Sequence, residues 1–103
     1  MQQVAESGCI VTNSPEVQIH HMFGASTRSG GVNIGHWAIL PLFWLLHDIR
    51  SDRPDNITLH KLEFEWRHGT EKQLFTYMID RFTAADQPTP PVEVVELILE
   101  YHK

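Results

Sequence analysis

The chain has 103 residues, of which 42% are hydrophobic and 10% aromatic, enough for the core of one small domain. Its formal net charge is −5 with neutral histidines, the wrong sign for a protein that grips nucleic acid by bulk charge alone. No apolar run reaches the roughly 18 residues of a membrane span, and we expect no secretory signal. The single cysteine, Cys9, excludes an internal disulfide framework and favours a reducing cytoplasm.

The first part of the chain predicts short strands separated by loops. A strand is expected to start at 9–11 and to end at the turn-forming residues 13–15. Residues 16–23 alternate apolar and polar side chains, which is the pattern of a half-buried strand. A polar, glycine-rich loop is expected over 24–31, and a third short strand is expected around 37–39.

Helices are predicted from residue 41 onward. Pro41 stands where a helix can begin, so 42–50 is predicted to be a buried helix. A loop is expected at 51–56, and the next helix is predicted over 58–68 with Gly69 as its C-terminal cap.

Two further helices are predicted before the C-terminus. Thr70 opens the first of them, with Gln73 placed to complete a capping box. Its apolar residues fall on one stripe, which comprises Leu74, Phe75, Met78, Ile79 and Phe82. A proline-rich linker is expected over 84–91, and a last helix over 91–102. A small hairpin followed by helices is an α+β domain.

Histidines are the most informative residues of the chain, which contains seven of them. His20 and His21 end the predicted strand 16–23, and strand geometry sends successive side chains to opposite faces. A bend at Gly24 would instead bring both rings into one cleft. His47 ends the apolar run that follows. Two histidines on a divalent ion leave positions for water and a phosphate oxygen, and a third histidine can deprotonate that water.

An ordered set of residues connects these histidines to a known family. The set comprises Cys9, His20-His21, Gly24, Leu40-Pro41-Leu42, His47, Leu59-His60, Phe64-Glu65 and Gly69. In this order it resembles the HNH (ββα-metal) endonuclease superfamily, and especially small phage-type members related to the recombination-enhancement nucleases. The resemblance implies an HNH-like ββα core at 9–69, which a flexible tail at 1–8 is expected to precede and a C-terminal helical extension at 70–103 is expected to follow.

The resemblance also implies roles for individual histidines. His20 and His47 would hold one divalent metal ion, which would be Mg²⁺, Mn²⁺ or Zn²⁺, and His21 would be the general base that activates water. Nitrogen ligands favour the transition metals over magnesium. His60 would add a ligand or position a phosphate, and His36 is a further candidate ligand.

The chain departs from the family in two respects. The four-cysteine zinc knuckle retains only Cys9, and no structural zinc is expected. The other knuckle positions hold residues that cannot bind zinc, Thr12, Phe43 and Leu46. The asparagine that orients the base histidine in many members is also missing, because its place falls near Ala38 with His36 close by.

The resemblance predicts a metal-dependent DNA endonuclease that hydrolyses phosphodiester bonds. Arg28 in the glycine-rich loop and Arg50 are candidate phosphate contacts by their charge. The alternative is a degenerate, non-catalytic module on the same scaffold that binds DNA or a protein partner. A third alternative is that the histidines are structural. A homodimer is a further expectation, because the predicted helices are short and apolar.

Overall fold

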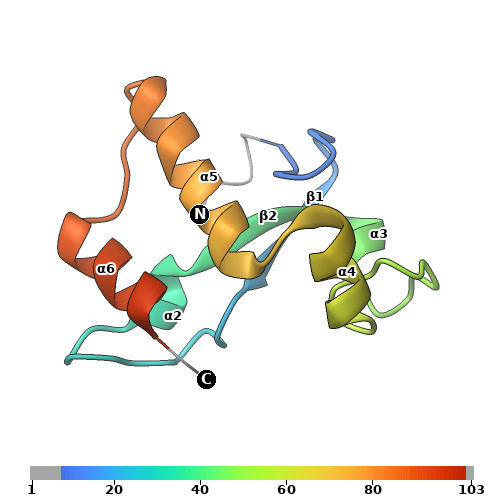
Figure 1. The fold of residues 1–103 in the computed structure, drawn as a ribbon, viewed down its shortest axis with the longest axis horizontal. Helices are drawn as coiled ribbons and strands as arrows, with labels where there is room; N and C mark the ends of the chain where they lie inside the picture. The colour runs from blue at the N-terminus through green and yellow to red at the C-terminus, as the bar shows by residue number, and fades with distance from the viewer. Residues whose placement is uncertain (1–7, 102–103) are drawn as a thin grey trace.

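The structure is a computed structural model that describes residues 8–101; the predicted tail residues 1–7, and residues 102–103 with His102, lie outside that range. Within it the fold is a two-stranded antiparallel sheet with five helices, which confirms the α+β prediction (Figure 1). The strands are β1 (Val17–His21) and β2 (Ile39–Phe43). The helices are α2 (Ile34–Trp37), α3 (Trp44–His47), α4 (Lys61–His68), α5 (Glu71–Ala84) and α6 (Val92–Glu100).

The strand β1 confirms the predicted alternating segment, whereas β2 replaces the start of a predicted helix. In the sheet His20 pairs with Leu40, and Ile19 pairs with Pro41. Pro41 therefore lies inside a strand, where a missing N–H is tolerated because each strand of a two-stranded sheet has an outer edge. The predicted helix 42–50 shrinks to the four residues of α3. A short run buried on both faces has no period that distinguishes a strand from a helix.

The strands predicted at 9–11 and around 37–39 are also wrong in detail. The segment after Cys9 is a turn, in which the Cys9 Sγ accepts hydrogen bonds from the Val11 and Thr12 amides at 3.4 and 3.3 Å. Trp37 ends the short helix α2, and the strand begins only at Ile39. Both segments combine local turns with bonds to distant parts of the chain: the Ile10 amide donates to the Pro41 carbonyl at 3.0 Å, and the Met22 amide donates to the Ala38 carbonyl at 2.9 Å. Propensity alone therefore gives the wrong element.

The predictions for the second half of the chain are largely confirmed. Gly69 caps α4 with a φ of 104°, a conformation that favours glycine. Thr70 and Gln73 form the predicted capping box in both directions. The α5 stripe contributes to the core through its buried residues Leu74, Phe75, Met78 and Phe82, and α6 contributes Val94 and Ile98.

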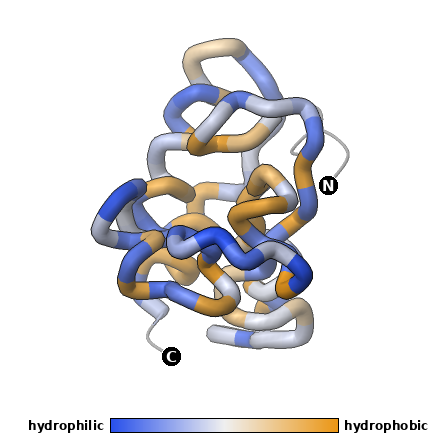
Figure 2. The backbone as a smooth tube through the Cα atoms, turned by 90° about the vertical axis from the view of Figure 1, so that its right-hand side faces the viewer, coloured by the Kyte–Doolittle hydropathy of each residue, from blue (hydrophilic) through white to orange (hydrophobic). Residues whose placement is uncertain are grey.

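The core is one cluster of buried side chains that runs from Cys9 to Ile98 and includes residues of β2, while Val17 and Ile19 of β1 are partly buried and pack against it. In Figure 1, α2 and α6 lie at one end of the hairpin, α3 and α4 lie at the other, and α5 rises from its middle. Figure 2 shows hydrophobic and hydrophilic stretches alternating along the tube. Among residues 8–101, no helix combines the length and hydrophobicity needed to cross a lipid bilayer.

Candidate functional site

Two of the predicted metal ligands come together in space. His20 lies near the end of β1, and His47 is the last residue of α3, which follows directly from the partner strand β2. Their ring centroids are 5.2 Å apart and the rings meet edge to face at 72°. The hairpin therefore brings the first histidine of the doublet to the histidine that lies 27 positions later in the chain.

His20 is held by a buried carboxylate at the start of α5. Its Nε2 donates to the Glu71 Oε2 at 2.7 Å, and the Lys61 Nζ donates to the other Glu71 oxygen at 2.9 Å. Burial by itself raises the pKa of the Glu71 carboxyl, but the hydrogen bonds from His20 and Lys61 outweigh it and hold the pKa below its ordinary value. Glu71 is therefore an ionised acceptor, and the His20 Nε2 carries a proton.

His47 is held by an amide whose orientation is itself fixed. The Gln18 Nε2 donates to the Asp48 Oδ2 at 2.8 Å, which turns the Gln18 Oε1 toward the His47 Nδ1 at 2.7 Å. Arg50 in turn donates to both Asp48 oxygens. Burial, followed by the nearby His20, lowers the pKa of His47, so its ring is neutral at pH 7 with the proton on Nδ1.

His21 points to a different acceptor, the backbone of α2. Its Nδ1 lies 3.1 Å from the Gly35 carbonyl oxygen, and because a carbonyl can only accept, Nδ1 is the donor. Gly35 packs so closely against the preceding loop that an added Cβ would lie 2.1 Å from the Gly24 carbonyl oxygen. Only glycine fits here, and the absence of a side chain lets α2 approach and orient His21.

His20, His21 and His47 share one property, and we refer to these three residues as the histidine cluster, although the ring contact in it is that of His20 with His47. Each ring has one nitrogen anchored to an acceptor, and its second nitrogen has no hydrogen-bond partner among residues 8–101. In that part of the chain every buried side-chain nitrogen or oxygen atom has a partner, so these three nitrogens reach the surface. Oriented imidazoles with an accessible lone pair can bind a metal ion or accept a proton.

Two oriented imidazoles can supply two side-chain ligands to an open metal site. An ion bound here would be held by His20 and His47, each of which donates its other ring N–H to a fixed oxygen. Such a partner behind the ligand is usual for histidines that bind metals. Among residues 8–101, no group of three or more His, Cys, Asp or Glu side chains is arranged to hold a metal ion.

The remaining candidate residues lie outside the cluster. His36 is exposed on α2 and packs edge-on against Trp37, and His60 is exposed just before α4. Arg28 is exposed and donates to the Gly31 carbonyl within its own loop. Arg50 joins the cluster indirectly, because its partner Asp48 is also the partner of Gln18.

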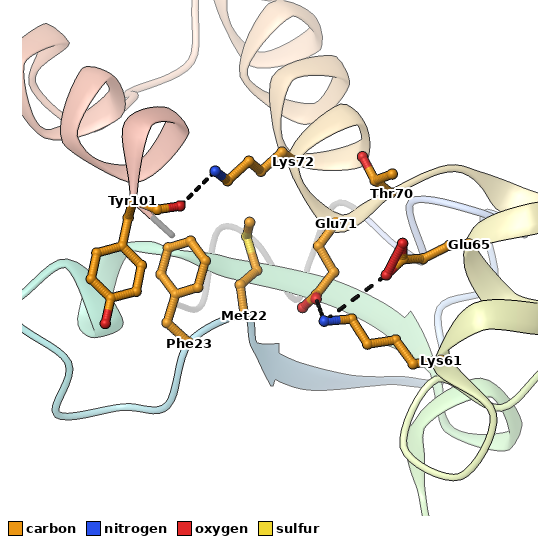
Figure 3. Close-up of a pocket in the computed structure, with 8 residues that line it drawn as sticks. All are labelled: Met22, Phe23, Lys61, Glu65, Thr70, Glu71, Lys72 and Tyr101. Carbon is orange, nitrogen blue, oxygen red and sulfur yellow. Dashed lines mark hydrogen bonds and ion pairs between the residues drawn. The ribbon is translucent and has the colours of Figure 1, made fainter. Parts of the chain in front are cut away.

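A pocket of about 350 Å³ adjoins the cluster on the side of Glu71. Figure 3 shows Met22, Phe23 and Tyr101 along its apolar part, with the Phe23 and Tyr101 ring centroids 4.7 Å apart. Lys61, Glu65 and Glu71 belong to its charged part, in which Lys61 lies between the two carboxylates. The histidines do not line the pocket, so Glu71 is the residue that connects the two features.

Sequence reasoning missed three residues that orient the cluster. Gln18 lies two residues before His20, and residues two apart on a strand share a face. The alternating pattern of the strand could therefore have placed Gln18 on the same face as His20. Glu71 lies 51 positions after His20, and Gly35 acts through its carbonyl group, so no local pattern connects either of them to a histidine.

In comparisons with known proteins, no family model, no curated protein and no solved structure matches this chain.

Proposed function

We propose that this protein is a metal-dependent endonuclease of the HNH type that hydrolyses phosphodiester bonds in DNA. The observation that carries the proposal is the histidine cluster, in which each ring has one nitrogen anchored and one accessible. The order of elements agrees with this proposal, because a strand ending in two histidines is followed by a second strand and a helix that supplies the third.

In this proposal His20 and His47 hold one divalent ion, and His21 is the general base. A bound ion would supply positive charge to stabilise the phosphate oxygens and a coordination position for water. Neutral imidazole is the form that binds metals, which agrees with the lowered pKa of His47. Nitrogen ligands favour Mn²⁺ or Zn²⁺ over Mg²⁺.

The carbonyl group of Gly35 supports the assignment of His21 as the base. A base histidine needs its far nitrogen unprotonated, and a fixed acceptor at the near nitrogen selects that tautomer. In the HNH pattern an asparagine often has this role, and this chain lacks it. The Gly35 oxygen, 3.1 Å from the His21 Nδ1, supplies an equivalent acceptor from the backbone.

The proposal extends to the partner and the location. DNA would contact the local basic residues Arg28 and Arg50, both of which are exposed. A bound cation would offset part of the net charge of −5. A role in phage recombination or DNA processing belongs to the same proposal, as does a cytoplasmic location, which agrees with the unpaired, buried Cys9.

A non-catalytic binding module is the second candidate function. Two large apolar side chains of α4, Leu62 and Trp66, are 84% and 80% exposed. Exposed apolar patches of this kind mark interaction surfaces. On this alternative the histidine cluster would be structural, and the protein would bind a protein partner or DNA without cleaving it.

Nicking of supercoiled plasmid DNA in the presence of Mn²⁺, Zn²⁺ or Mg²⁺ tests the proposal. The wild type should nick only with metal, and His21→Ala should lose about 10²- to 10⁴-fold in rate, the usual share of a general base. The matched control is His36→Ala, an exposed histidine outside the cluster, which should retain wild-type activity.

Calorimetric titration with Mn²⁺ or Zn²⁺ separates the two candidate functions. The endonuclease proposal expects one site that is lost in His20→Ala and in His47→Ala and kept in His36→Ala. A folded wild type that neither binds these ions nor nicks DNA would reject the endonuclease and leave the binding module.

A further inference from the structure

The outer face of α4 carries the most exposed apolar side chains in the described part of the chain, residues 8–101. Leu62 and Trp66 lie one turn apart and are 84% and 80% exposed, and Leu59, just before the helix, is 48% exposed. Phe64 is fully buried and points from the opposite side of the same helix into the core. The helix is thus apolar on two faces, and only one of them is covered within the chain.

Charged residues border this outer face on both sides in a regular arrangement. On one side Glu63 and Arg67 lie one turn apart and pair at 2.6 Å. On the other side Lys61 and Glu65 lie one turn apart at 3.9 Å, and Lys61 lies closer to Glu71, at 2.9 Å. Each border therefore contains one acid and one base with the same spacing as Leu62 and Trp66.

This arrangement is complementary to itself when the helix is reversed. In an antiparallel pair of α4 helices, Leu62 faces Trp66 of the second copy. On one border Glu63 then faces the Arg67 of that copy, and on the other Lys61 faces its Glu65. Along the sequence, the midpoint of each pair of facing residues falls within one residue of Phe64. A single two-fold axis that passes near Phe64 therefore satisfies all three pairings together, as a symmetric dimer interface requires.

We propose that the outer face of α4, formed by Leu59, Leu62 and Trp66 with their charged borders, is the interface of a symmetric antiparallel homodimer. The occupant is a second copy of this chain, because opposite charges meet on both borders. The proposal does not depend on the nuclease activity, and it holds equally for a binding module.

The size of the surface sets the expected strength of the dimer. Eight helical residues span about 12 Å, so α4 alone covers less than the roughly 1,600 Å² of a standard stable interface. The dimer should therefore dissociate on dilution, with a Kd in the micromolar range or weaker.

Sedimentation velocity from about 1 µM to about 1 mM tests the proposal, since this range brackets the expected Kd. The wild type should shift from monomer to dimer, and Leu62→Ser and Trp66→Ser should stay monomeric throughout. Both positions are exposed, so the variants should keep the wild-type circular dichroism spectrum. The matched control is Tyr77→Ser on α5, which removes a half-exposed aromatic elsewhere and should dimerise normally.

A charge exchange tests the antiparallel arrangement. Glu63→Arg places like charges opposite each other in the dimer and should weaken association at least several-fold. Adding Arg67→Glu to the same chain restores opposite charges only if the helices are antiparallel, and should restore the wild-type Kd. A wild type that is monomeric at about 1 mM, or a double variant that remains as weak as Glu63→Arg, would overturn the proposal.

Discussion

The histidine cluster and the loop before α4 are both rich in partly or fully buried polar groups, yet they use them differently. In the loop, Asn56 is fully buried and makes four hydrogen bonds. Its amide donates to the Leu45 and Asp48 carbonyl oxygens, and its side-chain oxygen accepts from the Thr58 and Leu59 amides. All of its donors and acceptors are thus used within the chain.

Asp55 shows the same saturation in this loop. Its side chain is 3% exposed and accepts two hydrogen bonds from Arg53, at 2.9 and 3.0 Å, and one from His68 at 3.0 Å. The Asp55 carboxylate therefore ties the loop to itself and to the end of α4.

In the histidine cluster each ring is anchored at one nitrogen only. Orienting a ring needs one hydrogen bond, whereas binding a ligand needs the second nitrogen to remain accessible. The comparison shows that burial of a polar group does not by itself indicate function. The informative feature is a group that is firmly held and still has an unused donor or acceptor at the surface.

Gly35→Ala should have the largest effect, because it connects stability to the histidine cluster. The new Cβ would lie 2.1 Å from the Gly24 carbonyl oxygen, so the backbone must move. We expect a loss of about 4 kcal/mol in the free energy of unfolding, measured by urea denaturation. The displaced carbonyl should also misplace His21 and lower nicking by about 10²-fold in protein that is still folded.

Ser26→Ala is the control for this prediction, because Ser26 is exposed and lies in the loop against which Gly35 packs. If Gly35→Ala matched the wild type in both measurements, the tight packing of α2 and the orientation of His21 by its carbonyl would be wrong.

Asn56→Ala should distinguish the loop before α4 from the histidine cluster, because we expect it to lower stability without changing activity. Its removal leaves two amides and two carbonyl groups without their partners, and we expect a loss of about 2–3 kcal/mol in the free energy of unfolding. The nicking rate per folded molecule should not change. The control is Asn33→Ala, which removes a single bond at 3.3 Å to the His36 amide and should cost about 1 kcal/mol.

Nicking that falls with Asn56→Ala beyond the loss of folded protein would contradict this separation. It would indicate that the loop also positions the histidine cluster, through Asp48 or α3.

The pH dependence of stability should show the smallest effect. Hydrogen bonds from His68 and Arg53 outweigh burial and hold the pKa of Asp55 below its ordinary value of 3.8. A carboxyl with a lowered pKa in the folded state stabilises the fold above its ordinary pKa, and this contribution is lost as pH falls through the folded value. Urea denaturation from about pH 6 to about pH 2.5 should therefore show stability falling below about pH 4.

Asp55→Asn should make this pH dependence shallower, although Glu71, whose pKa is also lowered, should maintain part of it. Asp52→Asn, an exposed change in the same loop, should leave the slope unchanged. An unaltered slope in Asp55→Asn would show that Asp55 is not a source of the acid sensitivity.

Prediction from sequence succeeded where a pattern is local. The Thr70–Gln73 capping box and the Gly69 cap depend on residues within one or two turns, and both are confirmed. The prediction failed where one sequence pattern is compatible with both a helix and a strand. Pro41 can start a helix or lie in an edge strand, and only pairing with Ile19 decided between them.

The same distinction between local and long-range information applies to the candidate site. The sequence by itself proposed the three histidines as candidates, because imidazole is a common metal ligand and base, and their roles stay predictions. The proton position on each ring depends on its acceptor, and these acceptors are Glu71, Gln18 and the Gly35 carbonyl. Glu71 lies 51 positions from its histidine and Gln18 lies 29 positions from its own, and the third acceptor belongs to the backbone. Only the tertiary structure decided these contacts, because chain folding, and not local propensity, brings distant groups within hydrogen-bond distance.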